Sequence, residues 1–181
     1  MKIKISMNCA VEEYSLTDNF DVRFTAYAPL HSFKGWARQG VEARIGIDFE
    51  AGAISYARAR AQTCRFDTGF ADRNKAMADY LQIDKYSESS IELAEVQAFT
   101  RLNDDRFQID ALAVLEFMGQ RRQLPIKFFI TRKDNGLSIA LDFKWSFKAY
   151  GLKAPRLLFI TVRDIVDISG KGEFVHADPV S

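Results

Sequence analysis

Apolar and polar residues alternate along most of the chain, a pattern typical of strands that bury one face and leave the other in water. The strongest case is the segment 139–147, where every second residue is large and apolar: Ile139, Leu141, Phe143, Trp145 and Phe147. The same alternation predicts strands at 22–28, 41–49, 54–64, 88–99, 107–117, 124–132 and 158–168. About eight strands are therefore expected.

Short turn segments separate several of these strands, at 50–52, 102–105, 118–120 and 133–136. Each contains glycine or asparagine, which tolerate positive φ. Long strands joined by such turns pair antiparallel. Closing the sheet into a barrel removes both exposed edges, so the favoured fold is all-β, a single antiparallel β-barrel, with a two-sheet sandwich as the alternative. A chain of 181 residues fits one such domain, 1–181.

One stretch has helical spacing instead. In the segment 70–81, Phe70, Asn74, Met77 and Leu81 recur at intervals of three or four residues, while charged residues take the other positions. The pattern predicts one short amphipathic helix. Such a helix either covers one mouth of the barrel or is a connector that packs on the core.

Small residues bear on whether the barrel is hollow. In the segment 54–64 arginines alternate with alanines, and because arginine prefers water the alanines are expected to point inward. The small inward residues, including two from the segment 107–117, are Ala57, Ala59, Ala61, Ala111 and Ala113. An eight-stranded barrel is just wide enough to be filled by side chains or to hold one small ligand. The alternation leaves both possibilities open.

Composition narrows the function classes. The chain has 25 Lys and Arg against 24 Asp and Glu, so its net charge of +1 gives no overall field that would attract nucleic acid or an anionic membrane. A hydrophobic fraction of 48% is ordinary for a soluble globular protein. The 15 phenylalanines either fill a core or line a cavity for an apolar guest.

The cysteines and the first residues bear on the compartment. Cys9 and Cys64 are too few for a disulfide framework or a cysteine metal site, which favours a reducing compartment. The segment 1–13 alternates charged and apolar residues and contains no apolar stretch of an export signal. A cytoplasmic location is therefore expected, or a periplasmic one if a leader has been removed.

Few residues suggest chemistry. His31 and His176 are the only histidines, and their spacing suggests no shared metal. No serine or cysteine stands in a recognisable pattern with a histidine and a carboxylate, so we expect neither an enzyme nor a bound cofactor. A late group of cations is either a solvated face or a contact for a phosphate head at a barrel mouth: Lys144, Lys148, Lys153 and Arg156.

Three segments resemble a known family. The segment 66–69 reads Phe-Asp-Thr-Gly and is followed by a charged helical stretch and Lys85-Tyr86. The segment 115–119 reads Leu-Glu-Phe-Met-Gly and leads into a Leu-Pro-Ile run. The segment 147–152 reads Phe-Lys-Ala-Tyr-Gly-Leu and precedes a strand with alternating acidic residues. In order and spacing these resemble the YceI-like domain family, the lipocalin-like barrels known for binding polyisoprenoids.

The resemblance implies a non-enzymatic carrier that holds a long apolar lipid, a polyisoprenoid or an isoprenoid quinone, in the barrel lumen. The residues expected to line the lumen are Phe24, Ile45, Ile47, Ala59, Ala61, Ala111, Ala113, Leu141, Phe143 and Trp145, with Met77 and Leu81 closing one end. The alternatives are a packed barrel that serves as a stress-response or interaction module, and an enzyme that uses the lumen as its active site. The sequence also leaves open the possibility of a homodimer that forms through the barrel wall.

Overall fold

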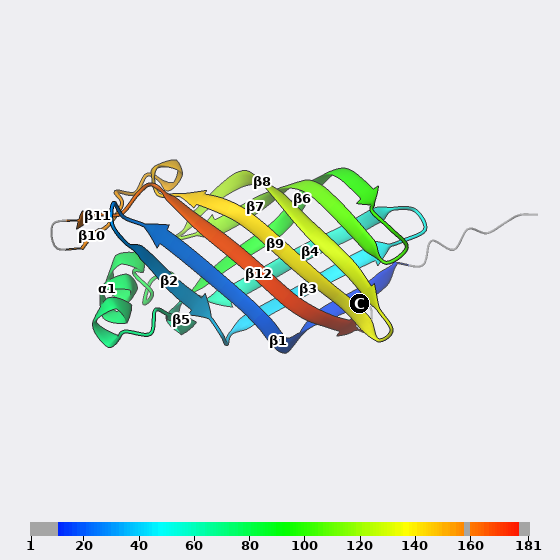
Figure 1. The fold of residues 1–181 in the computed structure, drawn as a ribbon, viewed down its shortest axis with the longest axis horizontal. Coiled ribbons are helices and arrows are strands. Elements are labelled where there is room, and N and C mark those ends of the chain that lie inside the picture. Colours follow the sequence, from blue (N-terminus) through cyan, green and yellow to red (C-terminus); the bar gives the residue numbers. More distant parts are fainter. Residues whose placement is uncertain (1–10, 158–159, 178–181) are drawn as a thin grey trace, which may run out of the picture.

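Long antiparallel strands form a closed ring in the computed structural model, which describes residues 11–157 and 160–177 (Figure 1). The strands are β1 (Glu12–Tyr27), β2 (Ser32–Ala37), β3 (Val41–Asp48), β4 (Ala53–Gln62), β5 (Phe66–Asp67), β6 (Glu88–Arg101), β7 (Arg106–Phe117), β8 (Gln120–Lys133), β9 (Gly136–Ser146), β10 (Arg156–Leu157), β11 (Ile160–Thr161) and β12 (Ile165–His176). The ring runs in the order β12-β9-β8-β7-β6-β4-β3-β1, and β1 pairs again with β12. The predicted antiparallel eight-stranded barrel with one short helix, α1 (Ala71–Leu81), is confirmed.

The strands β2 and β3 share one position in this ring. At one end of β1, Tyr27 pairs with Ser32, and at the other end Glu12 pairs with Ile47. Both pairings have the same register, so β2 and β3 lie end to end along β1. The chain turns between them at Gly40, which has a φ of 67°. The short strand β5 pairs with the other edge of β2.

The last strand differs from its prediction. The alternation indicates a strand at 158–168, whereas the structure begins β12 at Ile165; the first two residues of the predicted strand lie outside the described residues. The chain bends just before β12 because the Asp164 carboxylate accepts hydrogen bonds from the Ser146 hydroxyl at 2.7 Å and from the Lys148 N–H at 2.8 Å. The predicted strand 158–168 was therefore wrong in its bounds, because it took the bend before Ile165 and the first residues of β12 for one continuous strand.

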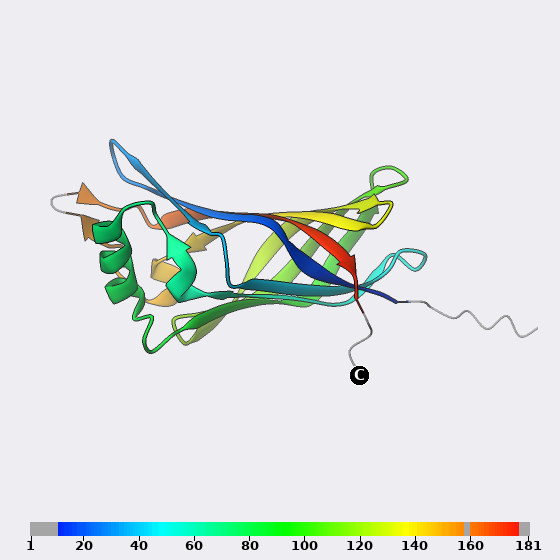
Figure 2. The ribbon, with the colours of Figure 1, turned by 90° about the horizontal axis from the view of Figure 1, so that it is seen from below.

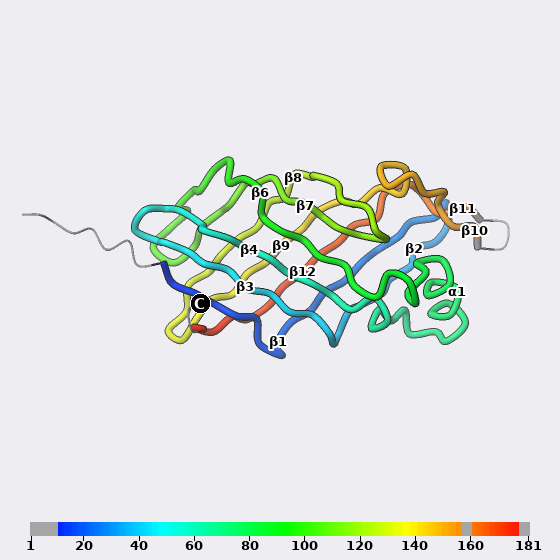
Figure 3. The backbone as a smooth tube through the Cα atoms, turned by 180° about the vertical axis from the view of Figure 1, so that it is seen from behind, coloured from blue at the N-terminus to red at the C-terminus, as the bar shows by residue number. Residues whose placement is uncertain are grey.

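The helix α1 lies at one end of the barrel, as does the short hairpin β10/β11 (Figure 2). The chain leaves the barrel wall after β4, forms β5 and α1, and returns as β6, a path that Figure 3 shows from behind. The start of α1 is held by Asn74, whose side-chain oxygen accepts the Thr68 N–H at 2.8 Å and the Thr68 hydroxyl at 2.6 Å. Its side-chain nitrogen donates to Asp67 at 2.8 Å. Among the described helices, none has the length and apolar character needed to span a membrane.

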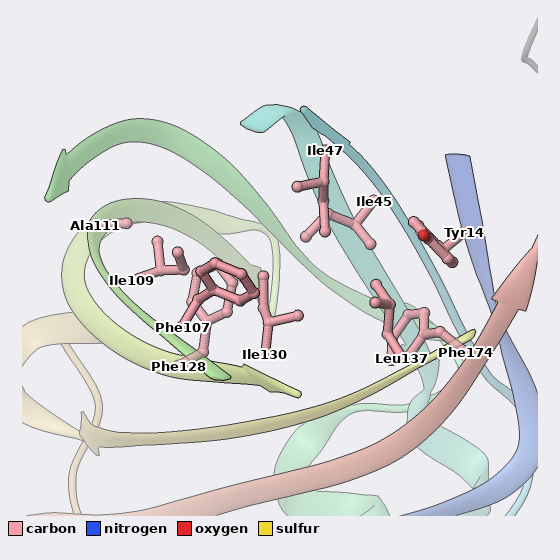
Figure 4. Close-up of a cluster of buried hydrophobic side chains, with 10 residues drawn as sticks. All are labelled: Tyr14, Ile45, Ile47, Phe107, Ile109, Ala111, Phe128, Ile130, Leu137 and Phe174. Atoms are coloured by element: carbon pink, nitrogen blue, oxygen red, sulfur yellow. The ribbon is translucent and has the colours of Figure 1, made fainter. Parts of the chain in front are cut away.

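Two apolar clusters divide the interior. The far cluster fills the part of the barrel away from α1, and its side chains point toward one another (Figure 4): Tyr14, Ile45, Ile47, Phe107, Ile109, Ala111, Phe128, Ile130, Leu137 and Phe174. The near cluster lies on the α1 side and consists of Leu115, Trp145, Phe147, Tyr150, Val162 and Val166. Ile47, Ile109 and Ile130 of the far cluster have no exposed surface. The far part of the barrel is therefore a packed core.

Candidate functional site

A cavity of about 550 Å³ lies between the barrel interior and α1. Sites for small molecules usually measure roughly 300–1,000 Å³. Side chains from β1, β2, β4, β6, β7, β9, β12 and α1 surround the space, and most of them are apolar: Val22, Phe24, Ala26, Phe33, Ala37, Ala59, Ala61, Met77, Tyr80, Leu81, Ile91, Leu115, Phe117, Leu141, Phe143, Trp145, Phe147, Val166 and Ile168. The cavity therefore suits an apolar guest.

The far cluster forms the floor of this cavity. On β4, Ala59 and Ala61 line the cavity, whereas Ala57 packs against the far cluster. On β9, Leu141 lines the cavity and also touches that cluster, and Ile139 lies wholly on the packed side. A guest that enters from the α1 end therefore stops at the level of Leu141, because branched and aromatic side chains fill the interior beyond it.

Aromatic rings make up one wall. The ring centroid of Trp145 lies 4.6 Å from that of Phe147, 5.2 Å from that of Phe117 and 5.4 Å from that of Tyr150. The Tyr150 hydroxyl donates to the Leu115 carbonyl at 3.1 Å, and burial raises the pKa of Tyr150. The Trp145 indole N–H lies beside that hydroxyl but outside hydrogen-bond geometry. These contacts fix the wall, because every ring packs against at least one other.

A glycine on β2 makes room for one of the lining rings. Phe24 of β1 pairs with Gly35 of β2, and a Cβ on Gly35 would fall 2.0 Å from the tip of the Phe24 ring. The Phe24 ring centroid also lies 6.1 Å from that of Phe66 on β5. Any larger residue at position 35 would displace Phe24, so this glycine sets where the ring lies.

The helix α1 covers the cavity with Met77, Tyr80 and Leu81. The Tyr80 hydroxyl donates to the Lys153 carbonyl at 2.8 Å, and its ring meets that of Phe147 edge to face at 6.0 Å. Burial raises the pKa of Tyr80 above its ordinary value. These contacts tie the helix to the segment that follows β9.

Two of the four lining arginines are paired with carboxylates. Arg60 donates two hydrogen bonds to Glu42. Arg23 forms an ion pair with the carboxylate two residues before it. The Arg73 guanidinium instead lies 5.1 Å from the ring centroid of Phe33 and 4.6 Å from that of Phe70. Among the described residues, Arg73 and Arg156 are the lining cations that form no ion pair.

The lining holds little that supports covalent chemistry. Its polar members are arginines, serines and a threonine, without a histidine, cysteine or carboxylate to act as a base: Arg23, Arg60, Thr68, Arg73, Ser89, Ser90, Arg156 and Ser169. Hydroxyls without an adjacent base are weak nucleophiles. Within 11–157 and 160–177, no three His, Cys, Asp or Glu side chains are grouped to hold a metal ion. The arrangement favours binding by burial.

Eight of the residues that the sequence suggests for the lumen line the cavity: Phe24, Ala59, Ala61, Met77, Leu81, Leu141, Phe143 and Trp145. Ile45, Ile47 and Ala111 lie in the far cluster instead. Ala113 is fully buried and belongs neither to the cavity lining nor to that cluster. The proposed site therefore consists of the first eight and their neighbours.

Sequence reasoning missed several lining residues. Phe33 lies on β2, which the alternation did not indicate, and Phe66 lies on the two-residue strand β5. Tyr80 lies three residues after Met77 and one before Leu81, so helical spacing would have placed it on the cavity side of α1. The signal for Phe66 was its position directly before the Asp-Thr-Gly run.

In comparisons of sequence, no protein-family model and no curated protein matches the chain. Solved structures match its fold. BcnA from Burkholderia cenocepacia aligns with a TM-score of 0.70 at 14% identity, over 85% of this chain and 95% of its own. A polyisoprenoid binding domain from Saccharophagus degradans aligns with a TM-score of 0.70 at 17% identity, over 91% and 98%. The YceI protein of Campylobacter jejuni gives 0.62 at 11% identity, over 81% and 86%. The barrel thus has the fold of YceI-like proteins.

Proposed function

We propose that this protein is a non-enzymatic carrier that binds an apolar lipid, a polyisoprenoid or an isoprenoid quinone, in the cavity beneath α1. The observation that carries the proposal is the apolar cavity of about 550 Å³, with a packed floor on one side and a helical cover on the other. The shared fold with a structure described as a polyisoprenoid binding domain supports this class of ligand.

The floor limits how much of the lipid is enclosed. A methylene group takes up about as much space as a water molecule, roughly 30 Å³, so a cavity of this volume holds about 18 carbon-sized groups. That corresponds to a chain between farnesyl and geranylgeranyl in length. A longer polyisoprenoid would leave its remaining units outside the cavity, at the α1 end.

Burial of the apolar chain is the main source of binding free energy. Each enclosed methylene contributes about 0.8 kcal/mol, so about 18 of them contribute roughly 14 kcal/mol. Association costs roughly 4–15 kcal/mol in lost freedom, so the net binding free energy is at most about 10 kcal/mol and the tightest expected dissociation constant is about 50 nM. The selectivity among lipids would come from chain length, because the cavity offers few polar groups that could hydrogen-bond to a head group.

A titration of the purified chain with geranylgeraniol tests the proposal. Trp145 lines the cavity and the other tryptophan, Trp36, does not, so the Trp36→Phe variant reports on the cavity alone. We expect a saturable change in fluorescence at one lipid per protein. If neither geraniol, farnesol nor geranylgeraniol produces a saturable change, and calorimetry shows no heat of binding, the carrier proposal is wrong and a packed interaction module takes its place.

A further inference from the structure

Large apolar side chains are exposed at the end of the barrel that holds the cavity. Leu30, in the turn between β1 and β2, is 84% exposed, and Phe70, directly before α1, is 62% exposed. Ile165, at the start of β12, is 40% exposed. Figures 1 and 2 show the β1–β2 turn, α1 and the hairpin β10/β11 at this same end. The far end also exposes Val11, Leu102 and Val175, at 42–47%, so the cavity end is distinguished by the greater exposure of Leu30 and Phe70.

The exposed ring of Phe70 is held in place by a cation. The Arg73 guanidinium lies 4.6 Å from the ring centroid of Phe70 and 5.1 Å from that of Phe33 on β2. The contact joins the beginning of α1 to the beginning of β2, close in sequence to Leu30. An apolar tip and a positive charge therefore stand together at this end.

The segment between β9 and β12 adds further positive charge. Its cations, Lys148, Lys153, Arg156 and Arg163, are all exposed, and none forms an ion pair with a described residue. On the barrel strands, by contrast, about half of the cations are ion-paired, among them Lys127 with Asp110, Lys133 with Glu173, and Lys144 with Asp167. The charge at the cavity end is therefore available to a partner.

The turns at the opposite end of the barrel are acidic. The turns there, between β3 and β4, between β6 and β7 and between β8 and β9, contain acidic residues and no basic ones: Glu50, Asp104, Asp105 and Asp134. Arg101, Arg106 and Lys133 stand on the strands beside these turns, and at the cavity end α1 and the residues after it carry as many acids as bases. The positive excess at the cavity end therefore comes from the segment between β9 and β12. A negatively charged surface would orient the barrel with its cavity end first.

We propose that the cavity end docks on a bilayer that contains anionic lipids, with Leu30 and Phe70 entering the interface and the cations contacting the head groups. Apolar side chains ringed by lysine and arginine are what interfacial membrane binding requires. A bilayer is favoured over a protein partner because the apolar tips project singly from separate turns, which a fluid surface accommodates better than a rigid one. Docking does not depend on what the cavity holds.

Sedimentation with vesicles tests this docking. The full chain is mixed with vesicles of phosphatidylcholine alone, or of phosphatidylcholine and phosphatidylglycerol in equal parts. We expect binding to the mixed vesicles, weakened by added salt because the attraction is screened. The double variant Lys148→Gln/Lys153→Gln should bind about 25-fold more weakly, about fivefold for each charge. Leu30→Ser/Phe70→Ser should weaken binding by at least about tenfold.

Matched variants elsewhere on the barrel serve as controls. Leu102, in the turn between β6 and β7, is 47% exposed at the far end, and Lys171 of β12 is an exposed cation with no ion pair to a described residue. Leu102→Ser and Lys171→Gln should bind vesicles like the unaltered chain. The docking proposal is overturned by equal binding to both vesicle types, by control variants as damaging as the test variants, or by no vesicle binding from a chain that still binds geranylgeraniol in solution. The last result would leave the carrier proposal standing.

Discussion

Replacing Ala59 by phenylalanine should abolish tight lipid binding while leaving the barrel folded. Ala59 faces the cavity from β4, just above the packed level marked by Ala57. The new ring adds six carbon atoms, which occupy about 180 Å³ at roughly 30 Å³ each, close to a third of the 550 Å³ cavity. The lipid then loses about six methylene positions, worth roughly 5 kcal/mol, so the dissociation constant should rise by about three to four orders of magnitude.

Calorimetric titration with geranylgeraniol measures this loss, and thermal unfolding shows whether the variant is folded. The melting temperature should not fall, because the ring enters empty space and does not overpack a filled core. Ala53→Phe is the matched control, since Ala53 is exposed at the other end of the same strand, and it should bind like the unaltered chain. Unchanged affinity in Ala59→Phe would refute the reasoning, because it would place the lipid outside this cavity.

Three further predictions follow from the cavity and its cover. Among linear prenols the dissociation constant should fall about fourfold for each added methylene up to about geranylgeraniol, and then level off at solanesol, in the same calorimetric assay. Gly35→Val should weaken geranylgeraniol binding, because a Cβ at this position meets the Phe24 ring at 2.0 Å; fluorescence titration measures the loss, and unaltered affinity would contradict it. Asn74→Ala should lower the melting temperature by a few degrees, because it removes the hydrogen bonds that hold the start of α1. The Asp67 carboxylate also belongs to this network, and the hydrogen bonds that it accepts from Asn74 and from the Gly69 N–H lower its pKa. The stability that these hydrogen bonds give the folded protein is fully present above about pH 3.8, and it is lost as the pH falls through the lowered pKa. The difference in melting temperature between Asn74→Ala and the unaltered chain should therefore narrow in acid, and a difference that stays constant would argue against the network.

The alternation of side chains predicted most strands because each has one buried and one wet face. It failed at β2, where the small residues Gly35 and Ala37 are buried and the large Trp36 lies partly exposed with the Arg38 guanidinium 5.0 Å from its ring centroid. The pattern of apolar size is reversed there, so the strand does not stand out. In such a strand, small residues occupy the inward face because an aromatic ring from the neighbouring strand takes up the space beside them.

The last strand was obscured for a related reason. Its second half contains Gly170 and Gly172, which interrupt the apolar pattern. Gly172 fits because a Cβ there would fall 2.3 Å from the Leu16 side chain of β1. Close approach between neighbouring strands, which a single sequence does not reveal, decides where these glycines stand.

The cavity was harder to predict than the fold. The alternation of apolar and polar residues indicates whether a side chain points inward, but it does not indicate how far along the barrel axis the residue lies. Ile45 pairs with Ala57 at the packed level, whereas Val41 pairs with Ala61 beside the cavity, although all four point inward. The boundary between core and cavity depends on how the strands are staggered, and only the structure supplies that stagger.

Native mass spectrometry of the purified protein, followed by organic extraction and lipid analysis, tests the carrier proposal most directly. We predict one adduct per chain, with the mass of an isoprenoid lipid, that is present in the unaltered protein and in Ala53→Phe and absent from Ala59→Phe. A clean protein mass that persists after incubation with geranylgeraniol and an isoprenoid quinone would contradict the proposal.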